Sequence, residues 1–343
     1  MEKTVCNWLQ ILKPFFLFIT LYKTNFSFIM LFFFLVYLTE STDVVIGSVY
    51  RSKGLLIEAQ NQKIRDFWTP ARLKAAKSLD IILPKLPQGR SLASKNRSNR
   101  PPSGVPGSMP PIRSRLIRTI NSNGHQVYTT GKVFFHAPDG DYMCSGAIVT
   151  STTGDLVATA AHCVYDIDQH VWLTSNWVFI PAYSNGSRLY GTWPARNFIV
   201  LEAWTNYGDY NYDVAFVALS TLGGWHIQSY LGSQGVGFNC ARSDYTYSIG
   251  YPDNVDDGNY QKSCVGYAQN STDKESNYRG QQLACHMAGG ASGGPWLQYV
   301  DESSGMGYVT AVNSFIISSL GSYIYGPYFD SNIQSLYDSA KTM

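Results

Sequence analysis

Spacings typical of metal ligands are missing from this sequence. It contains six cysteines and six histidines, yet none of them form a C-x-x-C or an H-x-x-x-H pattern. Closely spaced cysteine and histidine pairs of this kind hold most protein-bound zinc. We therefore expect no metal and no cofactor. Long apolar runs are also scarce: residues 26–38 form the longest, and they fall short of the roughly 20 residues that a membrane-spanning helix needs.

Histidine is absent after residue 286, and this absence separates the possible arrangements of a nucleophilic serine. The string Gly-Ala-Ser-Gly-Gly at 290–294 fits the G-x-S-x-G turn of hydrolases that run serine, acid, histidine along the chain. All six histidines precede Ser292, so that order is excluded. The order acid, histidine, serine needs an upstream acid that opens an apolar run as Asp213 does, which is not the case for the candidates Asp139, Asp141 and Asp155. The order His162, Asp213, Ser292 remains.

Three motifs supply the groups that nucleophilic catalysis by serine needs. His162 lies in Thr-Ala-Ala-His-Cys, Asp213 opens Asp-Val-Ala-Phe-Val-Ala-Leu, and Ser292 lies in Gly-Gly-Ala-Ser-Gly-Gly-Pro. A serine hydroxyl is a weak nucleophile, so it needs an imidazole to take its proton and a buried carboxylate to orient that imidazole. We predict these three residues as catalytic, with Asp209 as the fallback acid. The glycines allow the N–H groups of Gly290 and Ser292 to point at one spot, which predicts an oxyanion hole.

From about Gly131 to Tyr337 the chain resembles the trypsin-like serine peptidases of the chymotrypsin fold. The motifs around His162 and Ser292 carry the resemblance, together with Cys144 in Cys-Ser-Gly-Ala-Ile-Val. The branch related to glutamyl endopeptidases is the most similar, in Gly-Lys-Val-Phe-Phe from residue 131, in Cys-His-Met-Ala-Gly-Gly from residue 285 and in a C-terminal helix. The resemblance implies an all-β fold of two Greek-key six-stranded β-barrels with a C-terminal α-helix. It also implies that Ser314 supports the buried aspartate.

Local patterns agree with this architecture. Short β-branched or aromatic runs, separated by Gly, Asn, Asp and Ser clusters, predict strands at 146–149, 156–160, 177–180, 197–201, 213–219 and 307–312. Near residue 335 the spacing of apolar residues changes to that of a helix, because Ile333, Leu336 and Tyr337 stand at i, i+3 and i+4. We expect an amphipathic helix there, with its apolar face on the second barrel.

The substrate pocket departs from the family pattern. Ala291 precedes the serine, where animal trypsin-like enzymes have an aspartate that pairs with the new N-terminus after activation, so that switch is not expected. His286 replaces the pocket-floor aspartate, which argues against strict lysine or arginine selectivity. Glutamate selectivity is not implied either, since Asn313 stands where the glutamyl endopeptidase branch has its glutamate-binding histidine. Ile316 replaces a glycine that is usual at the rim of the pocket, which should narrow its entrance. By resemblance, the pocket residues are His286, Met287, Asn313, Ser314, Phe315 and Ile316.

Cysteine usage indicates an oxidising compartment. Cys144 and Cys163 bracket the approach to the histidine, and Cys264 and Cys285 bracket the approach to the serine. Each pair would close a loop of about 20 residues and contribute roughly 3 kcal/mol. Cys6 belongs to the targeting segment, so Cys240 is left over; it either competes for Cys264 or stays buried as a small hydrophobic residue.

The region before the catalytic motifs divides in two. Residues 1–39 read as a signal peptide or an uncleaved signal anchor. Residues 40–118 carry 15 Lys and Arg against 5 Asp and Glu, and 84–111 are rich in Pro, Gly, Ser, Asn and Arg, which predicts a basic, partly disordered propeptide or linker. Residues 119–343 form the predicted peptidase domain. They carry 8 Lys and Arg against 18 Asp and Glu, so the basic segment can dock on the domain as an intramolecular inhibitor or folding aid.

Together these features predict a secreted serine endopeptidase, made as a zymogen, that cleaves polypeptides through a covalent acyl-enzyme. The alternative is a catalytically silent protease-like domain that binds a partner; esterase action would use the same residues. We expect a monomer and no nucleic-acid partner. Asn185 and Asn270 open glycosylation sequons.

Overall fold

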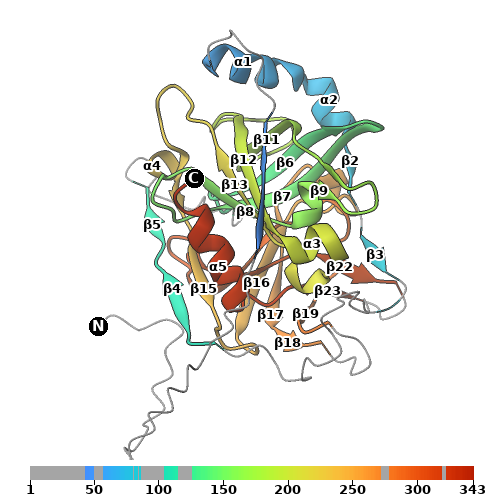
Figure 1. Ribbon diagram of the computed structural model, residues 1–343, viewed down its shortest axis with the longest axis vertical. Coiled ribbons are helices and arrows are strands. Elements are labelled where there is room, and N and C mark those ends of the chain that lie inside the picture. The colour runs from blue at the N-terminus through green and yellow to red at the C-terminus, as the bar shows by residue number, and fades with distance from the viewer. Residues whose placement is uncertain are drawn as a thin grey trace, which may run out of the picture.

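The computed structural model describes residues 43–49, 57–79, 81–83, 85, 104–114, 126–271, 278–318 and 322–343. Strands dominate, and the helices are few and short (Figure 1). The predicted targeting segment at 1–39 and the predicted boundary at 118/119 lie outside the described residues. Among the residues that are described, no helix is long and apolar enough to cross a membrane.

Six antiparallel strands close into a barrel in the first half of 126–343. In sheet order they are β12 (Trp193–Leu201), β11 (Ser175–Pro181), β6 (Thr130–Ala137), β7 (Gly140–Val149), β8 (Leu156–Thr159) and β13 (Ala215–Leu219), which pairs back to β12. Side chains alternate between the two faces: Val133 and Phe135 lie in the barrel core, whereas Phe134 between them packs outside it against Trp68.

The second half divides its strands between two sheets. One contains β17 (Lys262–Tyr267), β16 (Tyr245–Gly250), β20 (Pro295–Asp301), β21 (Met306–Val312), β15 (Gly235–Phe238) and β4 (Gly107–Met109). The other contains β18 (Gln269–Asn270), β19 (Gln281–Ala284), β23 (Tyr323–Gly326), β22 (Phe315–Ile317) and β3 (Ile82–Leu83). The chain changes sheets at Asn313 and Ser314, because β21 pairs with β20 whereas the Ser314 N–H donates to Tyr325 in β23. The predicted all-β, chymotrypsin-like fold is confirmed, with the closed six-stranded barrel in the first half.

The remaining elements of 126–343 are short connectors, apart from one C-terminal helix. They are η2 (Ala161–Cys163), β9 (Tyr165–Asp166), β10 (Val171–Trp172), α3 (Glu202–Tyr207), η3 (Tyr210–Tyr212), α4 (Ile227–Leu231), β14 (Gly232–Ser233), η4 (Asp256–Gly258) and α5 (Ser331–Ala340).

Helix α5 confirms the predicted amphipathic pattern and corrects where it packs. Ile333, Leu336 and Tyr337 are buried. They share one core cluster with Phe216 of the first barrel and Phe238 of the second half, so α5 packs on both halves rather than on the second alone (Figure 1). The apolar stripe is wide enough for two partners, because residues spaced three and four apart cover a broad face.

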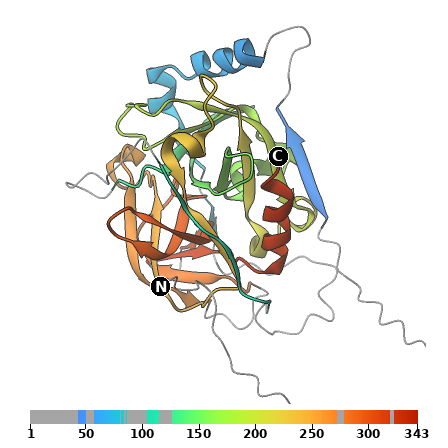
Figure 2. The same ribbon diagram turned by 90° about the vertical axis from the view of Figure 1, so that its left-hand side faces the viewer.

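The described part of the N-terminal segment is spread over the surface of both halves. It comprises β1 (Val44–Ser48), α1 (Ile57–Phe67), α2 (Pro70–Ala75), β2 (Lys77–Ser78), β3, β4 and β5 (Ile112–Arg113). Figures 1 and 2 show α1 and α2 at the top of the molecule, with β4 and β5 running along another side. The expectation of a flexible linker over 84–111 is not met at β4, because its backbone pairs with β15. Composition could not reveal a strand whose partners come from the other end of the chain.

Disulfides join Cys144 to Cys163 and Cys264 to Cys285, as predicted. The expectation that Cys240 is left over is wrong, because the described part of the chain contains no free cysteine. The prediction rested on spacing along the chain, which did not reveal the pairing of Cys240.

Candidate active site

His162 lies in the single turn η2, directly after β8. The Cys144–Cys163 disulfide ties this turn to β7. The His162 side chain is 3% exposed, and its Nδ1 lies 2.7 Å from Oδ2 of Asp213. Its backbone N–H donates to the other carboxylate oxygen at 2.9 Å. The imidazole and the carboxylate are therefore held in one relative orientation by two separate contacts.

Asp213 is fully buried between η3 and β13. Besides the two contacts with His162, its Oδ2 accepts a hydrogen bond from Ser314 Oγ at 2.5 Å. A buried carboxylate is costly unless donors surround it, and here three donors do so. The structure thus brings His162, Asp213 and Ser314 together as the sequence predicted.

Ser292 lies on the turn between β19 and β20. Gly290 and Gly293 flank it with φ of +81° and +80°, a region that residues with a Cβ rarely adopt. A Cβ on Gly293 would also lie 2.1 Å from Thr159 Oγ1. The Ser292 carbonyl oxygen accepts from the Ser145 N–H at 2.7 Å and lies 3.8 Å from Cys163 Sγ. The serine turn is therefore held against β7 and η2.

Hydrogen-bonding groups stay unused around this turn. His162 Nε2 is buried and has no hydrogen-bond partner among the described residues. The N–H groups of Gly290 and Ser292 likewise donate to no acceptor within the described ranges. One imidazole nitrogen and two amide donors are thus available for a molecule that enters the site.

Ser145 is a supporting residue that the sequence did not single out. Its Oγ donates to the Gly290 carbonyl at 2.8 Å and accepts from the Tyr251 N–H at 2.9 Å. It thereby fixes the glycine whose N–H is predicted to form the oxyanion hole. Its place beside Cys144 was visible in the sequence, but its contact with a residue 145 positions away was not.

Asn313 lies at the serine turn with its amide fully engaged. Its Oδ1 accepts from Ser248 Oγ at 2.6 Å and Trp296 Nε1 at 2.7 Å. Its Nδ2 donates to the Ile249 and Ala291 carbonyls at 3.1 and 2.9 Å. The Asn313 side chain therefore stabilises the turn that carries Ser292 and has no free amide group for a substrate.

The predicted pocket residues separate into two places. Asn313, Ser314, Phe315 and Ile316 line a small hollow beside Ser292, together with Ile81, Ile82, Ala288, Gly289 and Ile324. His286 and Met287 line a different hollow, next to the Cys264–Cys285 disulfide. Met287 is buried in the core behind it, and His286 is exposed. The expected pocket-floor residue therefore lines another hollow than Ser292 does.

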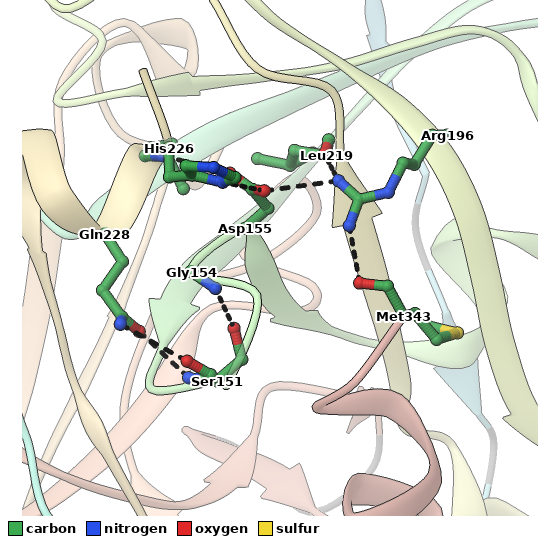
Figure 3. Close-up of polar contacts among 9 residues, drawn as sticks. Ser151, Gly154, Asp155, Arg196, Leu219, His226, Gln228 and Met343 are labelled. Atoms are coloured by element: carbon green, nitrogen blue, oxygen red, sulfur yellow. Dashed lines mark hydrogen bonds and ion pairs between the residues drawn. The ribbon is translucent and has the colours of Figure 1, made fainter. Parts of the chain in front are cut away.

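Other acids considered from the sequence have other partners. Asp209 accepts from the Asn211 N–H and side-chain amide at 3.0 and 2.8 Å. Asp155 is buried near the C-terminal end of α5 and accepts from His226 Nδ1 at 2.6 Å, with Arg196 3.4 Å away (Figure 3). This second histidine–carboxylate pair belongs to another part of the molecule, where Arg196 also bonds the Met343 carbonyl at 2.6 Å.

Cys144, Cys163 and His162 bring three potential metal-ligand atoms within 4.8 Å of one another. The two sulfurs form a disulfide, which removes the thiolates that a metal would need. The cluster is therefore a covalent support for the histidine turn.

A buried lysine, Lys132, contacts the loop of residues 251–258 that follows β16. Lys132 is 2% exposed, and its Nζ donates to the Gly258 carbonyl at 2.8 Å. Burial lowers the pKa of Lys132 to about 7, with the charge of Asp253 acting in the opposite direction. The Asp253 N–H bonds the Gly289 carbonyl at 2.8 Å, so this loop contacts the serine turn.

Comparisons with known proteins agree with this geometry. Residues 118–335 match the sequence model of the family described as Trypsin. The crystal structure of protease Anisep from Arthrobacter nicotinovorans is 37% identical, covers 64% of this chain and 98% of its own, and superposes with a TM-score of 0.59. The thermostable serine protease AL20 from an extremophilic microorganism is 36% identical over 63% of this chain and 98% of its own, with a TM-score of 0.58.

A more distant structure shares the fold alone. The structure of a Glu endopeptidase in complex with MPD is 17% identical over 66% of this chain and 96% of its own, with a TM-score of 0.51. A comparison with curated proteins found no match. The sequence match and the two structures above 30% identity confirm the resemblance to trypsin-like peptidases.

Proposed function

Since this chain belongs to the trypsin family, we propose that it is a secreted serine endopeptidase with Ser292 as nucleophile, His162 as general base and Asp213 as the orienting acid. One observation carries the proposal. His162 is bound through Nδ1 to a buried carboxylate, while its Nε2 is left without a partner among the described residues. In most buried histidines that serve only to support the fold, both nitrogens are hydrogen-bonded.

The proposed chemistry requires Ser292 Oγ to come within hydrogen-bond reach of His162 Nε2, which has no partner among the described residues. His162 Nε2 removes the proton from Ser292 Oγ as that oxygen attacks the carbonyl carbon of a peptide bond. The amides of Gly290 and Ser292 donate to the oxygen on which negative charge develops. His162 then gives its proton to the leaving amine, and water releases the acyl group in the second half of the reaction. Asp213 stabilises the charged imidazole, and Ser314 holds that carboxylate in place.

The hollow beside Ser292 indicates the class of side chain that it accepts. Ile316, Ile324 and Ala288 make its walls apolar, and none of the described residues that line it is a carboxylate. Beside these residues a lysine or arginine side chain would lose its hydration without gaining a charged partner. We therefore assign the pocket to small or aliphatic side chains.

Two features support secretion and processing. The two disulfides favour an oxidising compartment, and the basic N-terminal segment contacts the acidic domain through the ion pairs Arg72–Asp141 and Arg113–Asp301. The residue before Ser292 is the buried Ala291, which has no carboxylate to pair with an N-terminus that cleavage would form. Removal of the N-terminal segment is therefore the activation step that we propose.

An active-site label tests the proposed catalytic role. The full, disulfide-bonded chain is treated with a fluorophosphonate, and the modified residue is identified by mass spectrometry. We expect label at Ser292, no label there in Ser292→Ala, and a loss of kcat on the order of 10⁴-fold or more in that variant. Ser335→Ala, which changes an exposed serine of α5, serves as the matched control.

The outcomes separate the alternatives. A folded protein that stays unlabelled at Ser292 would establish a protease-like binding domain instead. Label at Ser292 with turnover of ester substrates but none of peptides would establish an esterase. Cleavage of peptides after small or aliphatic residues would support both the reaction and the pocket.

A further inference from the structure

A short part of the N-terminal segment lies beside Ser292. Ile81 and Ile82 line the same hollow as Ser292, Ser314 and Ile316. We call residues 77–79 and 81–83 the strap. A polypeptide that reaches Ser292 would have to enter the hollow that the strap already lines.

Backbone pairing holds the strap on both sides of this hollow. On the first barrel, Lys77–Ser78 pair in parallel with β7, and the Leu79 N–H donates to the Met143 carbonyl at 3.3 Å. On the second half, Ile82–Leu83 pair in parallel with β22. There the Ile316 N–H donates to the Ile81 carbonyl at 3.1 Å, and the Ser318 N–H donates to the Leu83 carbonyl at 3.0 Å. The strap therefore bridges the two halves at the candidate active site.

Alternate side chains of the strap pack against an aromatic wall. Ile81 and Leu83 contact the cluster formed by Tyr278, Phe315 and Tyr325, whereas Ile82 between them is 53% exposed. The rings of Phe315 and Tyr325 stack with their centroids 5.0 Å apart, which gives the wall a fixed surface. This is the pattern of an extended chain that presents every second side chain to a surface.

The chain before the strap is anchored firmly. Trp68 and Leu73 are buried against the first barrel, and Trp68 Nε1 donates to the Asn176 carbonyl at 2.6 Å. Ser78 Oγ donates to Asp253. A tethered segment has an effective concentration near its site of about millimolar, so weak local contacts suffice to keep the site occupied.

We propose that the strap is a built-in competitor of substrate, because it occupies the edge of β22 and the aromatic wall beside Ser292. The inference rests on the proposed function and adds the regulation of the same site. Main-chain hydrogen bonds hold the strap along β22, and the wall holds the aliphatic side chains of Ile81 and Leu83.

Charged substitutions in the strap provide the test. In the full chain, Ile81→Asp/Leu83→Asp places two carboxylates against the aromatic wall. We expect kcat/KM for casein to rise about tenfold or more, because a larger fraction of molecules has the surface free. The rate of labelling by a fluorophosphonate, which is much smaller than a peptide, should change far less. Ile57→Asp, an equally drastic change at an exposed position of α1, should leave both rates as in the parent.

The same measurements separate failure of this inference from failure of the proposed function. Label at Ser292 in parent and variant, with equal casein turnover, overturns the inference and leaves the peptidase intact. Absence of label in every folded form overturns the peptidase. If the charged variant does not fold, Ile81→Ala/Leu83→Ala replaces it, and unchanged casein turnover there overturns the inference as well.

A synthetic peptide adds an independent measurement. The peptide of residues 77–85, Lys-Ser-Leu-Asp-Ile-Ile-Leu-Pro-Lys, is added to the strap variant during casein cleavage. We expect it to raise KM and leave kcat unchanged, while the same peptide with aspartate at 81 and 83 has no effect. Equal inhibition by both peptides would show that the aromatic wall does not select aliphatic side chains.

Discussion

Ser314 and His162 contact the same oxygen of Asp213, so one carboxylate atom is shared by the imidazole and a hydroxyl. In the proposed mechanism the Ser314 hydroxyl takes no part in bond making and acts through the position and charge of the Asp213 carboxylate. Such a residue is expected to affect the rate of the chemical step more than the binding of substrate.

Replacing Ser314 should therefore lower kcat without changing KM. Ser314→Ala removes a hydrogen bond to a buried charge, a contact that contributes about 1.5–3 kcal/mol, so kcat should fall roughly 10- to 100-fold. Fluorophosphonate labelling should slow by a similar factor, and Ser314→Thr should recover part of the loss. Ser233→Ala, at a buried serine bonded to Thr150, is the control. A change in KM alone would contradict the positioning role.

Lys132 makes stability depend on pH in a direction that can be worked out. Its pKa is about 7 in the folded protein and near 10.5 when exposed, so between these values the folded state binds fewer protons than the unfolded state. Stability should consequently rise with pH above 7, by up to about 1.4 kcal/mol per pH unit. Below pH 7 both states are protonated, and the cost of burying the charge is constant.

The substitution Lys132→Met should remove this rise. Urea unfolding of the disulfide-bonded protein at pH 6, 7, 8 and 9 measures it. We expect the parent to gain stability across this range relative to Lys132→Met. Lys341→Met, at a surface lysine paired with Asp338, should keep the slope of the parent. A slope that persists unchanged in Lys132→Met would show that another group causes it.

At the candidate site, chain order led to the prediction of His162, Asp213 and Ser292, from the order of three motifs and the absence of a later histidine. The structure pairs His162 with Asp213, and the catalytic roles of the three residues stay a prediction. The supporting contacts of Ser145 and Asn313 were not predictable, because their partners lie up to 145 positions away in the sequence. The hollow that His286 faces depends in the same way on tertiary packing.

Among the elements, α5 connects the two halves. Its buried Leu336 and Tyr337 contact strands from both, and Tyr337 Oη donates to the Thr150 carbonyl at 2.6 Å. Neither half can bury this face of the helix alone, so α5 couples their stabilities.

Truncating this contact should destabilise the whole domain. Leu336→Ala leaves a cavity in a closely packed core, which costs about 2–5 kcal/mol. The neighbouring Ser335→Ala is exposed on the same helix and should change stability by no more than about 0.5 kcal/mol. Urea unfolding, followed separately by tryptophan fluorescence and by far-UV circular dichroism, gives the measurement. Two separated transitions in the parent would contradict the coupling.

Strand prediction succeeded where a β-branched or aromatic run stood between clusters of turn residues. The runs at 146–149, 177–180 and 307–312 fall within β7, β11 and β21. The five strands that the structure describes before residue 115 were not predicted, because each has only two to five residues and forms through pairing with distant strands. In such strands the partner, rather than local sequence preference, decides the conformation.

At the scale of the whole molecule, the opposite net charges of residues 40–118 and 119–343 predicted that the first segment docks on the second. Where the basic N-terminal segment is described, it lies on the acidic domain through two ion pairs and five strand pairings. Salt screens exposed ion pairs but leaves backbone pairing and buried Trp68 in place. Net charge therefore explains the attraction, and the strands explain its geometry.

The strand pairings of the N-terminal segment also have a consequence for the protein in concentrated solution. They cover main-chain N–H and C=O groups of β12, β14, β15 and β22. An uncovered strand edge is a template on which another chain can add. Removal of the segment, the activation step proposed above, would expose these edges. We therefore expect the processed form to associate with other chains at high concentration more readily than the full chain does.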